Sequence, residues 1–248
     1  MAKSWIVVWM GIELNFLFFL VIIRIQDFVK SEVRLKYFLI QSCGSIVFLF
    51  SFFFLSKHFL RDVFLKIAIL LKLGIVPLHL WVFSIVLELD WGIFFLFSSF
   101  QKIIPINILY YLEGRGKVSF YIVLILGVLI RGVGGINEFS LRKLLSYSSI
   151  SYVTWILCLT MEDKGEWLLN FVVYRVVLLR IIYVFEYIGI YHINQFFFLK
   201  NSKVMIVMFY IRFLSIGGIP PFLGFFLNDF CWWKFLINYP CFVSTLYL

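Results

Sequence analysis

The chain is built from apolar runs that are each long enough to cross a lipid bilayer. About 20 helical residues span the roughly 30 Å of bilayer hydrocarbon, and short polar connections separate the runs. The runs lie at roughly 4–25, 34–56, 60–87, 91–112, 118–137, 140–160, 166–190, 203–227 and 229–248. The sequence therefore predicts an all-α polytopic membrane protein with about nine transmembrane helices in a single transmembrane domain, 1–248.

The composition excludes a soluble domain. Hydrophobic residues make up 63% of the chain and charged residues only 14%, whereas a globular domain carries about 25% charged residues. The net charge of +9 is spread over connections and helix ends. A basic stripe for nucleic acid is absent from this pattern, so we expect no nucleic-acid partner. Basic helix ends instead favour contact with anionic membrane lipids.

The cysteines and the N-terminus exclude further classes. A structural metal or an iron–sulfur cluster needs clustered thiolates, and the sequence shows no such spacing among Cys43, Cys158, Cys231 and Cys241. We therefore expect no metal site on this chain. The start of the sequence, MAKSWIVVWMGIELNF, resembles neither a cleaved signal nor an Arg-rich transit peptide. It indicates a retained first span, so that an organellar location would require synthesis inside the organelle.

Glu13, Lys72 and Lys102 are charged residues that lie inside apolar runs. Each charge at a helix centre costs about 3 kcal/mol on insertion scales, so such residues normally have a function. The alternatives are a static hydrogen-bonded acid at Glu13 and a lysine that reaches the membrane surface at Lys72. Burial destabilises a charged lysine and a carboxylate stabilises it, which favours Lys72 and Lys102 as proton carriers.

Two of the runs contain residues that break a helix. Pro77 follows Gly74 in the third run, and the stretch GGIPPFLG at 217–224 interrupts the eighth. Broken helices beside polar side chains are typical of ion paths in transporters. His79 lies two residues after Pro77 and seven after Lys72, so it is a candidate proton relay. A lone histidine in a bundle is equally consistent with a hydrogen-bonded structural group.

The seventh run carries Arg175 and Arg180. Arginine does not release its proton in proteins, so these residues are expected to tune the local field or to form ion pairs rather than to carry protons. A purely structural role is equally consistent with the sequence.

Several motifs occur in the order found in one known family. The match covers nearly the whole chain, and its most specific part is the stretch from 134 to 155. The motifs are WMGIELN at 9–15, LKYFLIQ at 35–41, LKLGIVPLHLWV at 71–82, FQKIIPI at 100–106, GGINEFSLRKLLSYSSISYVTW at 134–155 and GGIPPFLGF at 217–225. In this set the chain resembles subunit 2 of mitochondrial NADH:ubiquinone oxidoreductase, respiratory complex I.

The resemblance implies an antiporter-like helix bundle with two broken helices and a line of buried charges that conducts protons. Glu13 resembles the key glutamate of the family, Lys72 the lysine of the first broken helix, and Lys102 the lysine of the following helix. NADH, FMN, the iron–sulfur clusters and ubiquinone are implied on partner subunits. The partners would be other membrane-arm subunits and membrane lipids, in the mitochondrial inner membrane.

The sequence also departs from the family pattern. Asn228 and Asp229 stand where the family usually has a lysine, and Lys234 lies further on. Arg175 and Arg180 are not part of the pattern. The chain is shorter than the animal form before WMGIELN and at its C-terminus, which fits a reduced subunit, a truncated product or one piece of a split subunit.

Three functions compete on this basis. The leading hypothesis is a core membrane-arm subunit in which Glu13, Lys72, His79 and Lys102 form the proton-translocation path, coupled to quinone reduction elsewhere. The first alternative is a stand-alone cation/proton antiporter, because it would use the same buried charges and broken helices. The second is a non-pumping structural subunit of the membrane arm.

Overall fold

The computed structural model describes residues 5–26, 31–53, 58–112, 117–162, 166–198, 207, 210–211 and 213–215. In this part of the chain there is no β-strand, and one isolated bridge joins Ser140 to His192. The helices are α1 (Trp5–Gln26), α2 (Ser31–Phe53), α3 (His58–Leu73), α4 (Leu80–Val86), α5 (Trp91–Tyr111), α6 (Lys117–Ile136), α7 (Leu141–Glu162), α8 (Glu166–Ile188) and the 3₁₀ helix η2 (Ile193–Phe198). The prediction of an all-α chain is confirmed.

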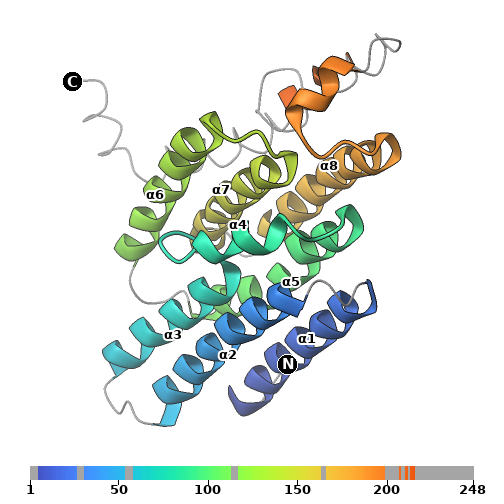
Figure 1. The fold of residues 1–248 in the computed structure, drawn as a ribbon. Helices are drawn as coiled ribbons and strands as arrows, with labels where there is room; N and C mark the ends of the chain where they lie inside the picture. The colour runs from blue at the N-terminus through green and yellow to red at the C-terminus, as the bar shows by residue number, and fades with distance from the viewer. Residues whose placement is uncertain are drawn as a thin grey trace, which may run out of the picture.

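The helices form two groups that share α5. Helices α1, α2 and α3 lie side by side, and α6, α7 and α8 form a second row (Figure 1). Helix α5 contacts α1 and α3 of the first group and α7 and α8 of the second. The short α4 packs against α2 and α7 and so also connects the two groups. Helix α5 is therefore the element through which a site in one group can reach a site in the other.

The third predicted run is broken, as its Gly74 and Pro77 indicate. Helix α3 ends at Leu73, and α4 begins at Leu80. Gly74 has φ +64°, and a Cβ at this position would lie 2.3 Å from Cγ2 of Val82. Only glycine fits this left-handed turn without strain. The second predicted break, at 217–224, and the last run, 229–248, lie outside the described residues.

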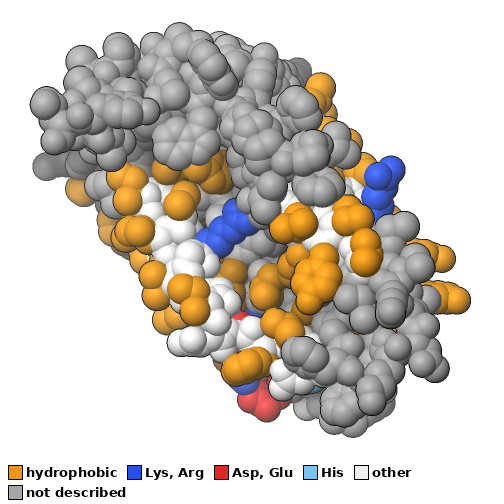
Figure 2. Space-filling model, turned by 90° about the horizontal axis from the view of Figure 1, so that it is seen from above, with side chains coloured by type: hydrophobic (Ala, Val, Ile, Leu, Met, Phe, Trp, Pro, Cys, Tyr) orange, Lys and Arg blue, Asp and Glu red, His pale blue; other side chains and the backbone are white. Residues whose placement is uncertain are grey.

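Four of the described helices are long and apolar enough to cross a membrane by length and composition: Trp5–Ile23, Ser31–Phe53, Trp91–Tyr111 and Trp167–Ile188. The described surface seen in Figure 2 is mostly hydrophobic, with few charged side chains. Helix α7 differs, because residues 148–157 are all buried and include several hydroxyls. A polar helix enclosed by apolar ones is the arrangement expected inside a lipid-facing bundle.

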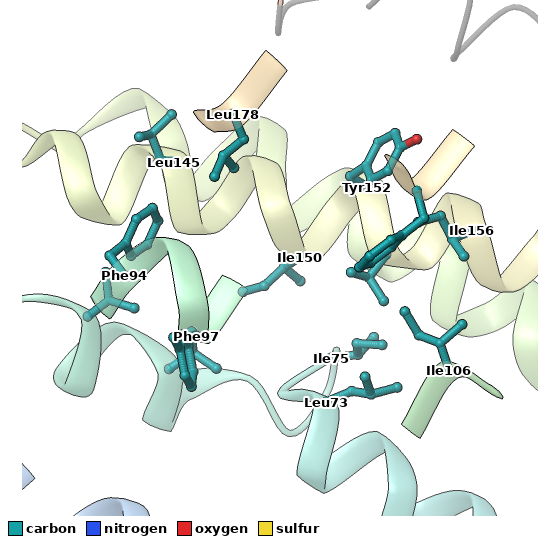
Figure 3. Close-up of a cluster of buried hydrophobic side chains, with 14 of the residues drawn as sticks. Leu73, Ile75, Phe94, Phe97, Ile106, Leu145, Ile150, Tyr152, Ile156 and Leu178 are labelled. Atoms are coloured by element: carbon teal, nitrogen blue, oxygen red, sulfur yellow. The ribbon is translucent and has the colours of Figure 1, made fainter. Parts of the chain in front are cut away.

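A cluster of apolar side chains fills the space beside the break between α3 and α4. Leu73 and Ile75 lie at the break, Ile106 comes from α5, and Ile150 and Ile156 come from α7 (Figure 3). All of these side chains are almost fully buried. Because lipid is as apolar as these residues, such a cluster stabilises a membrane protein through close packing rather than through the hydrophobic effect.

A clasp of four residues holds the junction of α4, α5 and α7. The Arg142 guanidinium donates a hydrogen bond to the carbonyl oxygen of Leu89, between α4 and α5. Its Cζ also lies 4.9 Å from the ring centroid of Tyr191 and 6.0 Å from that of Trp91. The two rings stack at 5.8 Å. The clasp thus fixes the start of α7 to the corner that follows α4.

Candidate functional site: a row of buried charges

The predicted pair of Glu13 and Lys72 is an ion pair in the structure. Lys72 Nζ donates to Glu13 Oε1 at 3.0 Å and joins the end of α3 to the middle of α1. The Lys72 side chain is 2% exposed and that of Glu13 is 21% exposed. Removing Glu13 would leave the buried charge of Lys72 uncompensated, which is destabilising.

Helix α2 shapes the space that Lys72 occupies. A Cβ at Gly44 would lie 2.9 Å from Lys72 Cγ and 3.2 Å from Lys72 Cε. Gln41, one turn earlier, donates from Nε2 to the backbone oxygen of Lys72 at 3.3 Å. Gly44 therefore provides room for the lysine stem, and Gln41 satisfies a carbonyl that the break leaves without an α-helical partner. The site prediction includes neither residue, although a glutamine in an apolar run was a signal for one of them.

His79 lies at the N-terminal end of α4, directly after the break. Its Nδ1 is 3.3 Å from the backbone oxygen of Pro77, and its ring meets the edge of Phe83 at a centroid distance of 5.6 Å. Phe83 in turn packs on Tyr147 of α7 at 4.2 Å. His79 is buried, but within the described residues it makes no hydrogen bond to either lysine. Its role as a relay stays a prediction.

Lys102 is the most enclosed of the predicted residues, at 3% exposed. It lies in α5, and its Nζ donates to Ser149 Oγ of α7 at 3.3 Å. Ser149 itself donates to the backbone oxygen of Ser146 at 2.9 Å. A hydroxyl can accept from a charged ammonium or, after rotation, donate to a neutral amine. This partner is thus compatible with both protonation states of the lysine.

An amide network joins the helices that carry the two ends of the row. Gln101, the neighbour of Lys102, accepts from Asn15 Nδ2 at 3.1 Å and from Tyr37 OH at 3.2 Å. Its own Nε2 donates to the backbone oxygen of Asn15 at 3.2 Å. Since Asn15 lies two residues after Glu13, this network couples α1 directly to α5. The site prediction includes neither Gln101 nor Tyr37.

The structure therefore brings Glu13 and Lys72 into contact and places Lys102 separately. No hydrogen bond links Lys72 to Lys102 within the described ranges. The apolar cluster that includes Leu73, Ile75 and Ile106 packs on the side of the break that faces α5 and α7 (Figure 3). A proton that moves between the two lysines must therefore use mobile groups or water around this cluster.

Arg175 is a further buried cation, on α8. It is 6% exposed, and none of its three guanidinium nitrogens has a hydrogen-bond partner in the described structure. Its Cζ lies 4.5 Å from the ring centroid of Phe171 and 5.3 Å from that of Tyr174. Arg180, on the same helix, is exposed. The two arginines of the seventh run are thus in different environments.

The described residues contain no group of three or more His, Cys, Asp or Glu side chains that could hold a metal ion. The departure from the family pattern at Asn228 and Asp229, and Lys234 further on, lie outside the described part of the chain.

The fold and the charges define a class. A helix broken between Gly74 and His79, an ion pair that joins it to a neighbouring helix, and a second buried lysine are features of antiporter-like membrane proteins. The family model for the transmembrane region of NADH:quinone oxidoreductase and Mrp antiporters matches residues 55–247. The chain belongs to this family.

Curated relatives agree with this assignment. The chain is 31% identical over 237 residues to NADH-ubiquinone oxidoreductase chain 2 of Anopheles gambiae, covering 90% of the chain and 69% of the relative. It is 35% identical over 229 residues to the protein of the same name from Artemia franciscana, covering 92% and 72%.

A solved structure shares the fold. Respiratory complex I from Thermus thermophilus with bound aureothin contains a chain that matches with a TM-score of 0.74 and 17% sequence identity. The match covers 91% of this chain and 57% of that one, so this chain spans a little over half of its structural relative. The antiporter-like fold that the sequence predicts is confirmed.

Proposed function

We propose that this chain is a membrane-arm subunit of a proton-pumping NADH:ubiquinone oxidoreductase in the mitochondrial inner membrane. Relatives at 31% and 35% identity carry the name of chain 2 of that enzyme. The other membrane-arm subunits are its partners, together with membrane lipids. NADH, FMN, iron–sulfur clusters and ubiquinone belong to partner subunits, and this chain performs no redox chemistry of its own.

The proton path consists of Glu13, Lys72, His79 and Lys102. The observation that carries this proposal is the 3.0 Å ion pair between Lys72 and Glu13 at the point where α3 breaks. The carboxylate stabilises the ammonium form of Lys72. When Glu13 moves away, that stabilisation falls, and Lys72 transfers its proton toward Lys102. His79, on the far side of the break, relays the proton with water.

Helix α7 supplies hydroxyls along the receiving end of the path. The serines at 146, 148, 149 and 151 each donate to a backbone oxygen three residues earlier. Their lone pairs remain able to accept hydrogen bonds, as Ser149 does from Lys102. These hydroxyls stabilise a proton or a water near Lys102 without adding a fixed negative charge that would trap it.

The test is Lys102→Ala in the assembled complex, with Lys36→Ala as the control. Lys36 pairs with Glu32 near the start of α2, and its side chain is 41% exposed. We expect fewer protons per NADH in Lys102→Ala and an unchanged ratio in Lys36→Ala. An unchanged ratio in Lys102→Ala, together with normal NADH oxidation, would exclude the role assigned to Lys102.

A stand-alone cation/proton antiporter is the second candidate, because the matching family also includes Mrp antiporters. It predicts ion-driven proton transport by the purified chain in lipid vesicles. Recovery of the chain only within a large NADH-oxidising assembly, with inactive vesicles, would reject this candidate.

A further inference from the structure

Gln101 of α5 binds two other helices through one side-chain amide. Its Oε1 accepts from Asn15 Nδ2 of α1 at 3.1 Å and from Tyr37 OH of α2 at 3.2 Å. Its Nε2 donates to the backbone oxygen of Asn15 at 3.2 Å and to Asn15 Oδ1 at 3.4 Å. Asn15 and Gln101 thus form a reciprocal amide pair, and Tyr37 connects a third helix to it.

Two polar contacts flank the buried face of α1. The buried side chains of this helix form one stripe, which consists of Ile12, Phe16, Phe19 and Ile23. At about 100° per residue, Glu13 lies on one edge of the stripe and Asn15 on the other. Glu13 pairs with Lys72 of α3, and Asn15 pairs with Gln101 of α5. Contacts on both edges oppose rotation of α1 about its own axis, so the Asn15 contact helps to set the direction in which Glu13 points.

The opposite face of α1 does little to resist such a rotation. Its side chains Leu14, Leu17 and Phe18 are exposed and apolar. Because lipid is as apolar as the buried stripe, exchanging one for the other has no hydrophobic cost, and close packing and hydrogen bonds between helices set the orientation. Without the amide pair, we expect α1 to turn more easily and Glu13 to point less reliably at Lys72.

The turn of α5 that carries Gln101 also depends on side-chain bonds. Pro105 lies inside α5 and has no N–H to donate to the backbone oxygen of Gln101, four residues earlier. Lys102, the residue after Gln101, is in the same turn. Since this turn has one backbone hydrogen bond fewer than a regular helix, the amide pair contributes to the position of Lys102 as well.

We propose that Gln101 is a positioning residue of the proton path. Its amide fixes the rotation of α1 that directs Glu13 toward Lys72, and it joins that helix to the turn of α5 that carries Lys102. Gln101 acts through these charged residues and does not itself carry the proton. The proposal rests on the proposed proton path, to which it adds a residue that sets the geometry at both ends.

The test is Gln101→Met in the assembled complex, which nearly keeps the length of the side chain and removes its hydrogen bonds. We expect the rate of proton pumping per assembled complex to fall about threefold. The matched control is Asn107→Leu, which removes another amide of α5 and should leave this rate unchanged. A merely structural role would lower the amount of complex on a native gel and leave the rate per complex unchanged, and that result would overturn the proposal.

An exchange of the two amides tests the pair even if Gln101→Met does not assemble. Gln101→Asn shortens one side of the pair and should slow pumping, and adding Asn15→Gln restores the combined length. We expect the double variant to pump within about 1.5-fold of the unchanged chain. A double variant as slow as Gln101→Asn would overturn the proposal.

Failure of this proposal is distinct from failure of the proton path. If Lys102→Ala lowers the protons per NADH while Gln101→Met pumps at the normal rate, the positioning role is wrong and the path stands. If Lys102→Ala leaves that ratio unchanged, the path is wrong, and the role of Gln101 in it is wrong as well.

Discussion

The two lysines Lys72 and Lys102 are both buried but have different partners. Lys72 binds the carboxylate of Glu13 at 3.0 Å, whereas Lys102 binds the hydroxyl of Ser149 at 3.3 Å. A carboxylate favours the ammonium form alone, but a hydroxyl can bond to either form. The carboxylate of Glu13 therefore stabilises only the charged form of Lys72, whereas the hydroxyl of Ser149 can bond to either form of Lys102.

The sharpest test of this difference is to remove each lysine in turn. Lys72→Met leaves Glu13 without its cation, and we expect a loss of about 3 kcal/mol in stability of the assembled complex. Lys102→Met removes only the hydrogen bond to Ser149, whose hydroxyl still donates to the backbone oxygen of Ser146, and should cost about 1 kcal/mol. Thermal denaturation of the purified complex measures both.

A double variant tests whether the unpaired Glu13 causes the loss of stability in Lys72→Met. Adding Glu13→Gln to Lys72→Met should recover most of the lost stability while proton pumping stays absent. Equal losses for the two single lysine variants would show that Glu13 does not distinguish them.

The second prediction concerns the room that α2 leaves for Lys72. In Gly44→Ala the new Cβ would lie 2.9 Å from Lys72 Cγ, so the lysine stem must shift away from Glu13. We expect a cost of about 2 kcal/mol and a matching loss of pumping. Gly11→Ala, where no atom lies within 4 Å, should be neutral. If both alanines behave alike, close contact at Gly44 does not position the pair.

The third prediction concerns the network that joins α1 to α5. Gln101→Leu removes the acceptor used by Asn15 and Tyr37. We expect a loss of about 1.5 kcal/mol in stability, since both groups are at least partly buried. Gln101→Glu keeps an acceptor and should lose less. Hydrogen exchange of the α1 amides would report the loosening, and unchanged exchange in Gln101→Leu would contradict it.

The smallest expected effect is at the partner of Lys102. Ser149→Ala removes the one hydrogen bond that Lys102 makes to a described residue. A loss of about 1 kcal/mol in the transfer step would slow pumping about fivefold. Ser51→Ala, at a buried serine of α2 whose hydroxyl donates to the backbone oxygen of Phe48 in its own helix, is the control. Equal turnover in the two variants would show that the hydroxyl does not act on the lysine.

The sequence predicts the charged residues of the site because a charge inside an apolar run is conspicuous. Glu13, Lys72 and Lys102 could be identified this way, and Gly74 and Pro77 indicated the break. Their pairing could not be derived from spacing, since it depends on which helices pack together. The pair became an expectation only through the family resemblance.

The supporting residues were harder to predict. Gly44 is important because the Lys72 side chain lies next to it. A glycine in an apolar helix has many possible roles, so the sequence does not indicate this one. Gln41 and Gln101 gave a weak signal, as amides in apolar runs. His79 was identified from its proximity in sequence to Lys72, but the turn after Leu73 directs the chain so that the histidine bonds the backbone at Pro77 instead.

The contacts of Arg142 fix one end of α4. The helix has seven residues and is held at Leu89, just beyond its C-terminal end, while its other end follows the glycine turn. Phe83, midway along α4, packs on Tyr147 of α7 at a ring-centroid distance of 4.2 Å, and Tyr147 lies two residues before Ser149, which accepts from Lys102. The helix that follows the break at Lys72 is thus in packing contact with the helix that supplies the described partner of Lys102.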